Sequence, residues 1–263
     1  MSDVTDSTRP ATCRVRYVAG PGAAPAGAPI DGIVAAVEER APAWVSRIAD
    51  FLSRDPIAPV IVTVYGGNGV SRTVGAEVVL PVNGDGSGVL AGLAHELVHA
   101  VAGRSPHPVL NEGLAVHTDA QLRLAGPVWP FYHLDPHRWM EVFREEGCRI
   151  PMAELLSALA QRPLAEDRAS IRARAIHYLH AASLTGHLLD RSAGAGFWSA
   201  FRAGAVVPAG VNPKSLETEW LARVAAPLTD EERRRRDRSF GIVAHTPLAG
   251  GSPTPVPPRR AAR

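Results

Sequence analysis

The chain has little of several features that define common protein classes. Only two of its 263 residues are cysteine, Cys13 and Cys148, so a scaffold stapled by several disulfides is excluded and at most one bridge can form. No apolar run approaches the roughly 18 residues of a membrane-spanning helix, and residues 1–10 hold no apolar core of signal-peptide length. We therefore expect a cytoplasmic protein without a membrane segment.

The chain also lacks an excess of charge of either sign. The formal net charge is +2, and Lys214 is the single lysine, so arginine carries the positive charge. This balance gives no strong attraction to nucleic acid, and we expect no nucleic-acid partner. Hydrophobic residues make up 46% of the chain and charged residues 21%, which suits one large domain or two close-packed halves around a cleft.

The most informative motif is His95-Glu96-Leu97-Val98-His99. Positions i and i+4 of a helix lie on one face, about one turn apart, so His95 and His99 can offer two imidazole nitrogens to one metal ion. Glu96 follows the first histidine and can point at a water on that ion. This is the H-E-x-x-H arrangement of zinc peptidases, in which the glutamate is the general base.

A second motif, Asn111-Glu112-Gly113-Leu114-Ala115, offers a third ligand. Gly103 and the prolines after it end the first helix, and Asn111 is a good N-cap for a second helix over 112–122. Two helices joined by so short a turn can fold back on each other, which would bring Glu112 near both histidines. The plain alternative is a buried helix pair whose histidines are satisfied by hydrogen bonds.

Together, HELVH and NEGLA resemble the gluzincin clan of zinc peptidases, in particular the peptidase MA-like proteins with a thermolysin-like core. The resemblance implies one Zn²⁺ held by His95, His99 and Glu112, with Glu96 catalytic. It spans about residues 13–225, and later segments also resemble the group, namely Tyr178–Leu184, 188–189, 197–198 and 216–220. The implied fold is α+β and zincin-like, with a small N-terminal mixed sheet, an edge strand over the active-site helix, and a mainly helical C-terminal subdomain.

The resemblance has one departure. Thermolysin-like enzymes place an Asp one turn after the ligand Glu, where it orients a ligand His, but Val116 occupies that position here. We expect Asp119 or a backbone carbonyl to take this role. The later helix should supply a donor for the oxyanion of the reaction, and Tyr178 is the candidate, with His177 and His180 behind it. A tyrosine that only packs between helices is the alternative.

The expected activity is hydrolysis of a peptide or protein substrate. Zinc lowers the pKa of its water towards about 7, Glu96 takes the proton, and the proton then goes to the leaving amine. No Gly-x-Met-Glu-Asn-type segment is present, which favours an endopeptidase over an aminopeptidase. The alternative is a zincin-like binding or regulatory module that keeps the metal but does not cleave, although Glu96 would then have no purpose.

Other metal assignments fit less well. A metzincin has a glycine three residues and a third histidine six residues after the second motif histidine, and this chain has Ala102 and Ser105 there. An aspzincin-like site would use Asp119 together with a Gly-Thr segment that is absent from the sequence.

Hydrophobic periodicity places the remaining elements. We expect a helix that Asp31 caps and that Pro42 kinks or divides, and a strand over 77–82 that Pro81 assigns to a sheet edge, where it could pair with an extended peptide. Further strands are expected over 14–18 and 60–65, and further helices over 136–146, 152–159, 167–189, 197–203 and 215–224.

These elements suggest four regions. Residues 1–12 are expected to be disordered, 13–125 to form an α/β subdomain with the metal motifs, and 126–226 a helical subdomain. The arginine- and proline-rich tail over 227–263 is expected to be disordered or at most a short solvated helix.

Overall fold

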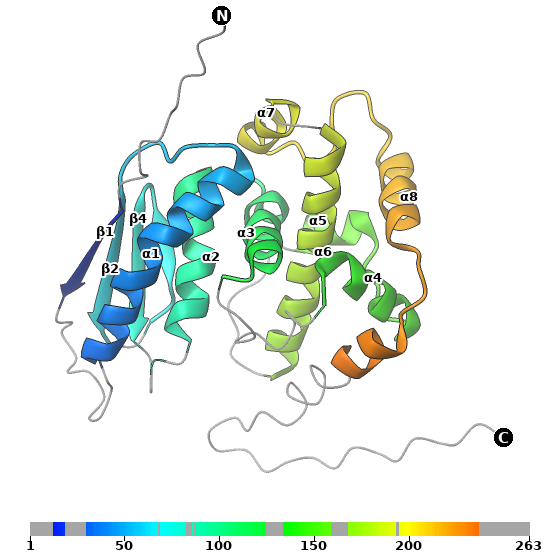
Figure 1. Cartoon of the computed structure of the whole chain (residues 1–263). Coiled ribbons are helices and arrows are strands. Elements are labelled where there is room, and N and C mark those ends of the chain that lie inside the picture. The colour runs from blue at the N-terminus through cyan, green and yellow to red at the C-terminus, as the bar shows by residue number, and fades with distance from the viewer. Residues whose placement is uncertain are drawn as a thin grey trace, which may run out of the picture.

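The computed structural model describes residues 13–18, 30–67, 69–82, 86, 88–124, 134–158, 168–192 and 195–236. The expectations for residues 1–12 and for the tail after 236 lie outside these ranges. The described residues have mixed α and β structure. A small sheet with two covering helices forms one side, and the later helices form the other (Figure 1).

The sheet has four strands in the order β1-β2-β4-β3. They are β1 (Cys13–Val18), β2 (Val60–Gly66), β3 (Arg72–Val74) and β4 (Glu77–Val82). Strands β1, β2 and β4 run parallel, whereas β3 pairs with β4 in the antiparallel direction. The strands expected from the sequence are confirmed, and β3 is an additional one that the periodicity did not predict.

The assignment of the strand over 77–82 to a sheet edge was wrong, because β4 lies between β2 and β3. The pairing with β3 covers only Glu77 to Val79, so it ends before Pro81, which is opposite Tyr65 of β2. A proline lacks the N–H that a second ladder would need, and here it lies beyond the end of that ladder. The edge strand beside the metal motif is therefore β3.

Helices α1 (Ile30–Leu52) and α2 (Val89–Ala102) pack against the sheet (Figure 1). Helix α1 contacts β1 and β2, and α2 contacts β4 and β3. Asp31 lies in the first turn of α1 rather than capping it, where its charge still suits the helix dipole. Pro42 does not divide this helix, which continues through it. Buried aliphatic side chains of the strands fill the interface, among them Val62, Val64, Val78 and Leu80.

The later helices form the second half. They are α3 (Pro108–Leu122), α4 (Pro136–Glu145), α5 (Met152–Ala158), α6 (Arg168–Ser192), α7 (Ala195–Ala203) and α8 (Pro213–Val224), and each expected helix is confirmed with bounds that differ by a few residues. Helix α6 packs along α3, and α3 also contacts α2. Helix α3 therefore lies between the half that contains the sheet and the helical half (Figure 1).

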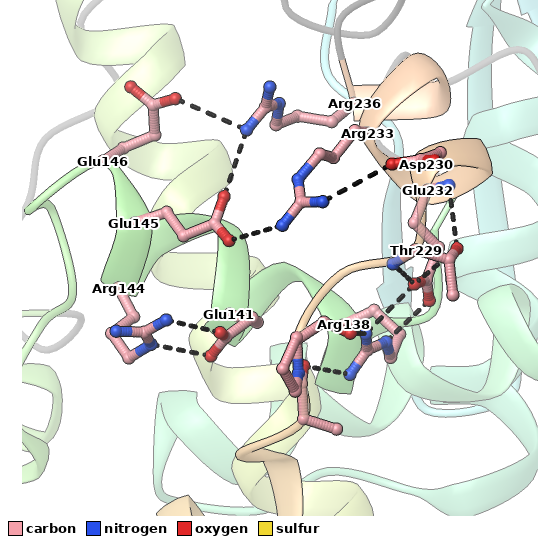
Figure 2. Close-up of polar contacts among 12 residues, drawn as sticks. Arg138, Glu141, Arg144, Glu145, Glu146, Thr229, Asp230, Glu232, Arg233 and Arg236 are labelled. Carbon is pink, nitrogen blue, oxygen red and sulfur yellow. Dashed lines mark hydrogen bonds and ion pairs between the residues drawn. The ribbon is translucent and has the colours of Figure 1, made fainter.

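The described part of the tail contains a short helix. Residues 230–236 are helical, and Leu228 just before them is buried. Figure 2 shows the polar contacts that join this segment to α4. Arg138 bonds both carboxylate oxygens of Glu232 and the main-chain carbonyl oxygens of Ala226 and Pro227. A short helix is the second of the two outcomes that the sequence allowed here, and the structure adds that its charged side chains have partners on α4.

The structure also bears on the expected lack of a membrane segment and on the two cysteines. Among the described residues, no helix is both long enough and apolar enough to cross a membrane. Cys13 and Cys148 are not joined by a disulfide, so the one bridge that the sequence allowed is not formed.

Candidate metal centre

Helix α2 presents both motif histidines from one face. An almost entirely apolar run forms this helix, and its buried side chains include Leu93, Leu97 and Val98. Gly103 ends the helix with a positive φ of 77°, and its N–H bonds the carbonyl oxygen of His99. Packing on the sheet fixes α2, so the directions of the two imidazoles are set by the core.

Helix α3 begins earlier than the sequence suggested. Its N-cap is His107, whose Nδ1 accepts a hydrogen bond from Val109 N, and Pro108 takes the first helical position. Asn111 is therefore not the N-cap. It is buried within the helix, where its side-chain oxygen accepts from Ser105 N at 3.3 Å and its amide donates to Glu112 Oε1 at 3.2 Å. The residue expected to start the helix instead supports the carboxylate beside it.

The structure brings His95, His99 and Glu112 together, and their ligand atoms all lie within 4.8 Å of one another. His95 Nε2 lies 3.1 Å from both His99 Nε2 and Glu112 Oε2, and His99 Nε2 lies 3.8 Å from Glu112 Oε1. The side chain of His99 is 5% exposed, whereas those of His95 and Glu112 are about one-fifth exposed. Solvent therefore reaches the trio from the side of His95 and Glu112.

This donor set fits a tetrahedral cation. Bonds of about 2.0–2.1 Å at tetrahedral angles place ligand atoms about 3.4 Å apart. The two Nε2 atoms are 3.1 Å apart, and each lies near a different carboxylate oxygen of Glu112, His95 at 3.1 Å from Oε2 and His99 at 3.8 Å from Oε1, so these separations lie on either side of that value. Both histidines turn Nε2 towards the group, and with one carboxylate oxygen they could supply three ligands of a tetrahedral ion. The group could hold a metal ion and leave the fourth corner to the solvent side.

Electrostatics at the trio favour an ionised Glu112 and a neutral His99. Burial alone would raise the pKa of Glu112, but its hydrogen bond to His95 and the nearby imidazoles lower the pKa to about 2. Burial opposes charge on His95, yet the bond to Glu112 and the charges of Glu112, Glu96 and Asp119 raise its pKa overall. Burial, together with the charge of His95, lowers the pKa of His99 to about 3. Neutral His99 and ionised Glu112 are the forms that bind metals.

Glu96 is buried at 7% exposure, and burial raises the pKa of its carboxyl group. Its Oε2 lies 2.7 Å from the hydroxyl oxygen of Thr73, which belongs to β3. Thr73 could not be predicted from the sequence, because a strand of three residues is too short to show an alternating pattern. A weak signal was that Thr73 is a polar residue two positions before the turn at Gly75.

Tyr178 of α6 lies beside the trio, as the sequence suggested. Its ring is nearly parallel to that of His95, at 11° with centroids 6.4 Å apart. Burial first, and then the charge of Glu112 and a hydrogen bond to it, raise the pKa of the phenol, so Tyr178 remains a donor at neutral pH.

His177 and His180, which are close to Tyr178 in the sequence, are not part of the trio. His180 is fully buried away from the trio and accepts from Ile150 N at 3.0 Å, while its Nδ1 donates to Ile176 O at 2.8 Å. These bonds give His180 a structural role. His177 is buried at 4% exposure, and it is not among the three ligand residues.

The position of the missing Asp is filled by buried Val116. Asp119 is close enough to raise the pKa of His95, after the larger effects of burial and of Glu112 and Glu96. His117 is buried against α6 and α4: its ring lies 6.1 Å from that of His137, and it fills the space beside Gly186.

Comparisons of the chain with family models, with curated proteins and with solved structures found no match. The fold and the site together define a mixed α+β protein with a small four-stranded sheet and a group of His95, His99 and Glu112 that could hold a metal ion.

Proposed function

We propose that this protein is a zinc-dependent peptidase, with His95, His99 and Glu112 as ligands of one Zn²⁺ and Glu96 as general base. The observation that carries the proposal is that the ligand atoms of the three residues lie within 4.8 Å of one another, and that Glu96, which follows His95 in the chain, is buried. Two imidazoles and one carboxylate are a common donor set of catalytic zinc, which keeps one position open. The antiparallel strand next to α2 supports a zincin-like arrangement.

The residues of the chain divide the chemistry between them. A bound zinc ion would lower the pKa of a water molecule and polarise the substrate carbonyl. Glu96 accepts the proton of the attacking water and passes it to the departing amine. Tyr178 donates a hydrogen bond to the carbonyl oxygen as negative charge develops on it.

The substrate is a peptide or protein bound in extended form. Strand β3 pairs with β4 on one side and contacts α2. A peptide strand added along the other side of β3 would therefore pass the trio. An extended segment held in this way is cleaved within its length, which suits an endopeptidase.

The test combines metal content with hydrolysis. The full chain is loaded with zinc, its metal is measured by mass spectrometry, and a mixed peptide library is digested with and without a chelator. We expect one equivalent of zinc, and cleavage that the chelator abolishes and added zinc restores. Glu96→Gln should keep the zinc and lose hydrolysis by about 10²- to 10⁴-fold. The control is Glu154→Gln, an exposed glutamate in α5, which should leave both unchanged.

Two results would contradict the proposal. The first is one equivalent of bound zinc without cleavage of any peptide, and with no change in either measurement in Glu96→Gln. The protein would then be a binding or regulatory module. A chain that binds no zinc would exclude both functions.

A further inference from the structure

Thr73 of β3 turns its side chain towards α2. It is 1% exposed, whereas its neighbours Arg72 and Val74 are exposed on the other side of the strand. Its hydroxyl oxygen lies 2.7 Å from Glu96 Oε2 and 2.9 Å from the main-chain oxygen of Glu96. The Thr73 side chain therefore contacts both the carboxylate and the main-chain oxygen of Glu96, the residue that follows the ligand His95.

The carboxylate is the favoured acceptor of these two. A threonine hydroxyl has a single proton, so it donates to one oxygen at a time. The main-chain oxygen of Glu96 lies inside α2, where the helix supplies its own donor, and a hydrogen bond to an ionised oxygen is shorter and stronger than one to a neutral carbonyl. The shorter distance is the one to Oε2.

Thr73 itself is held from two sides. Strand β3 is paired with β4 in a register that places Thr73 opposite Val78. On the side of α2, Arg104 donates from its guanidinium to the carbonyl oxygen of Thr73 at 2.8 Å. A β-branched side chain on a fixed backbone has few rotamers, so the direction of the hydroxyl is fixed as well.

We propose that Thr73 is a positioning residue, which donates a hydrogen bond to Glu96 Oε2 and so holds the carboxylate in the orientation that lets its other oxygen meet the attacking water. The inference rests on the proposed function, because it assigns Thr73 a part in that reaction. The physical basis is preorganisation: a carboxylate that is already oriented needs no search among rotamers when the substrate arrives.

Three substitutions separate this role from simple packing. Thr73→Val keeps the shape and removes the hydroxyl, and Thr73→Ser keeps the hydroxyl and removes the methyl group. The matched control is Thr63→Val in β2, because Thr63 is also nearly buried and also donates to a carboxylate, that of Glu77 at 3.0 Å, away from the trio. All variants are made in the full chain loaded with zinc.

Two measurements are made on each variant. In steady-state hydrolysis of a peptide that the wild type cleaves, Thr73→Val should lower kcat by about 10- to 100-fold with little change in KM and one equivalent of zinc still bound. Thr73→Ser and Thr63→Val should stay near the wild type. In crystal structures, the Glu96 carboxylate should keep one position in the wild type and in Thr73→Ser, and leave it in Thr73→Val.

The structural measurement keeps this inference separate from the peptidase proposal. If the wild type cleaves nothing but Thr73→Val still displaces the Glu96 carboxylate, the positioning contact is real and the proposed function fails. If Thr73→Val leaves both kcat and the Glu96 carboxylate unchanged, the positioning role is overturned. An equal loss in Thr73→Ser, or in Thr63→Val, would also overturn it, since the hydroxyl of Thr73 would not be the cause.

Discussion

Gly113 of α3 lies against the main-chain carbonyl oxygen of Ala181 in α6, so closely that a Cβ on Gly113 would come within 2.4 Å of that oxygen. The hydroxyl of Thr185 would be 2.3 Å from the same Cβ. A carbonyl inside a helix cannot move aside without moving the helix. Gly113 therefore sets the distance between α3 and α6, and with it the distance between Glu112 and Tyr178, which lie at or near this contact.

Gly113→Ala should separate these two helices. We expect the free energy of unfolding to fall by about 1–3 kcal/mol, because the added methyl group overpacks the interface. Urea titration followed by tryptophan fluorescence measures the change. The control is Gly32→Ala in α1, which has no heavy atom within 4 Å of its added Cβ and should gain a few tenths to about 1 kcal/mol from helix propensity. Equal stability of wild type and Gly113→Ala would contradict the close contact.

Single substitutions of the ligands should remove zinc without unfolding the chain. For His99→Ala we expect zinc affinity to fall by more than the roughly 100-fold loss typical of outer partners of a ligand. The helical circular dichroism should remain, because Leu93, Leu97 and Val98 hold α2 in the core. His107→Asn, which keeps an N-cap for α3, is the control. A collapse of the helical signal would instead mean that the metal is structural.

Tyr178→Phe tests whether the phenol donates to the substrate. Loss of an oxyanion donor should lower kcat by about 10²- to 10³-fold with little change in KM. The variant should still bind one equivalent of zinc, because Tyr178 is not one of the three ligand residues. Tyr17→Phe in β1, where the side chain is 43% exposed, serves as the control. An unchanged kcat in Tyr178→Phe would leave Tyr178 only a packing role, with its ring against that of His95.

The contact of the tail with α4 should depend on pH through Glu232 (Figure 2). The hydrogen bonds from Arg138, and then those from Thr229, lower the pKa of Glu232 to about 2. A lowered pKa means that the stabilisation is complete above the ordinary Glu value of about 4.3 and is lost as the pH falls towards about 2. Glu232→Gln should therefore cost about 1 kcal/mol at pH 7, with a gap to the wild type that narrows below pH 4.

Urea titrations at steps from pH 7 to pH 2.5 measure this gap. Glu231→Gln is the matched control, because Glu231 pairs with Arg235 on the exposed side of the same helix. A gap that stays constant over the whole pH range, or an equal loss in Glu231→Gln, would show that Glu232 does not hold the tail.

The sequence predicted the parts of the site that depend on local geometry. The spacing of His95 and His99 needs only a helix to bring both imidazoles to one face, and the apolar run around them predicts that helix. The errors occurred where two local signals competed. Asn111 is a good N-cap, but Pro108 is already suited to the first helical position, and the helix begins there. Pro81 favours an edge, but β3 is short enough to pair with β4 without reaching it.

By itself the sequence determined that α2 carries two histidines and a glutamate on a helix, because side-chain direction follows from a repeat of 3.6 residues per turn. Only the tertiary structure decided what those side chains meet. The contact of Glu112 with His95, the hydroxyl of Thr73 at Glu96 and the carbonyl of Ala181 at Gly113 each join segments that pack together in the fold. The physical reason is that such contacts depend on how helices and strands pack, and packing is set by the whole core.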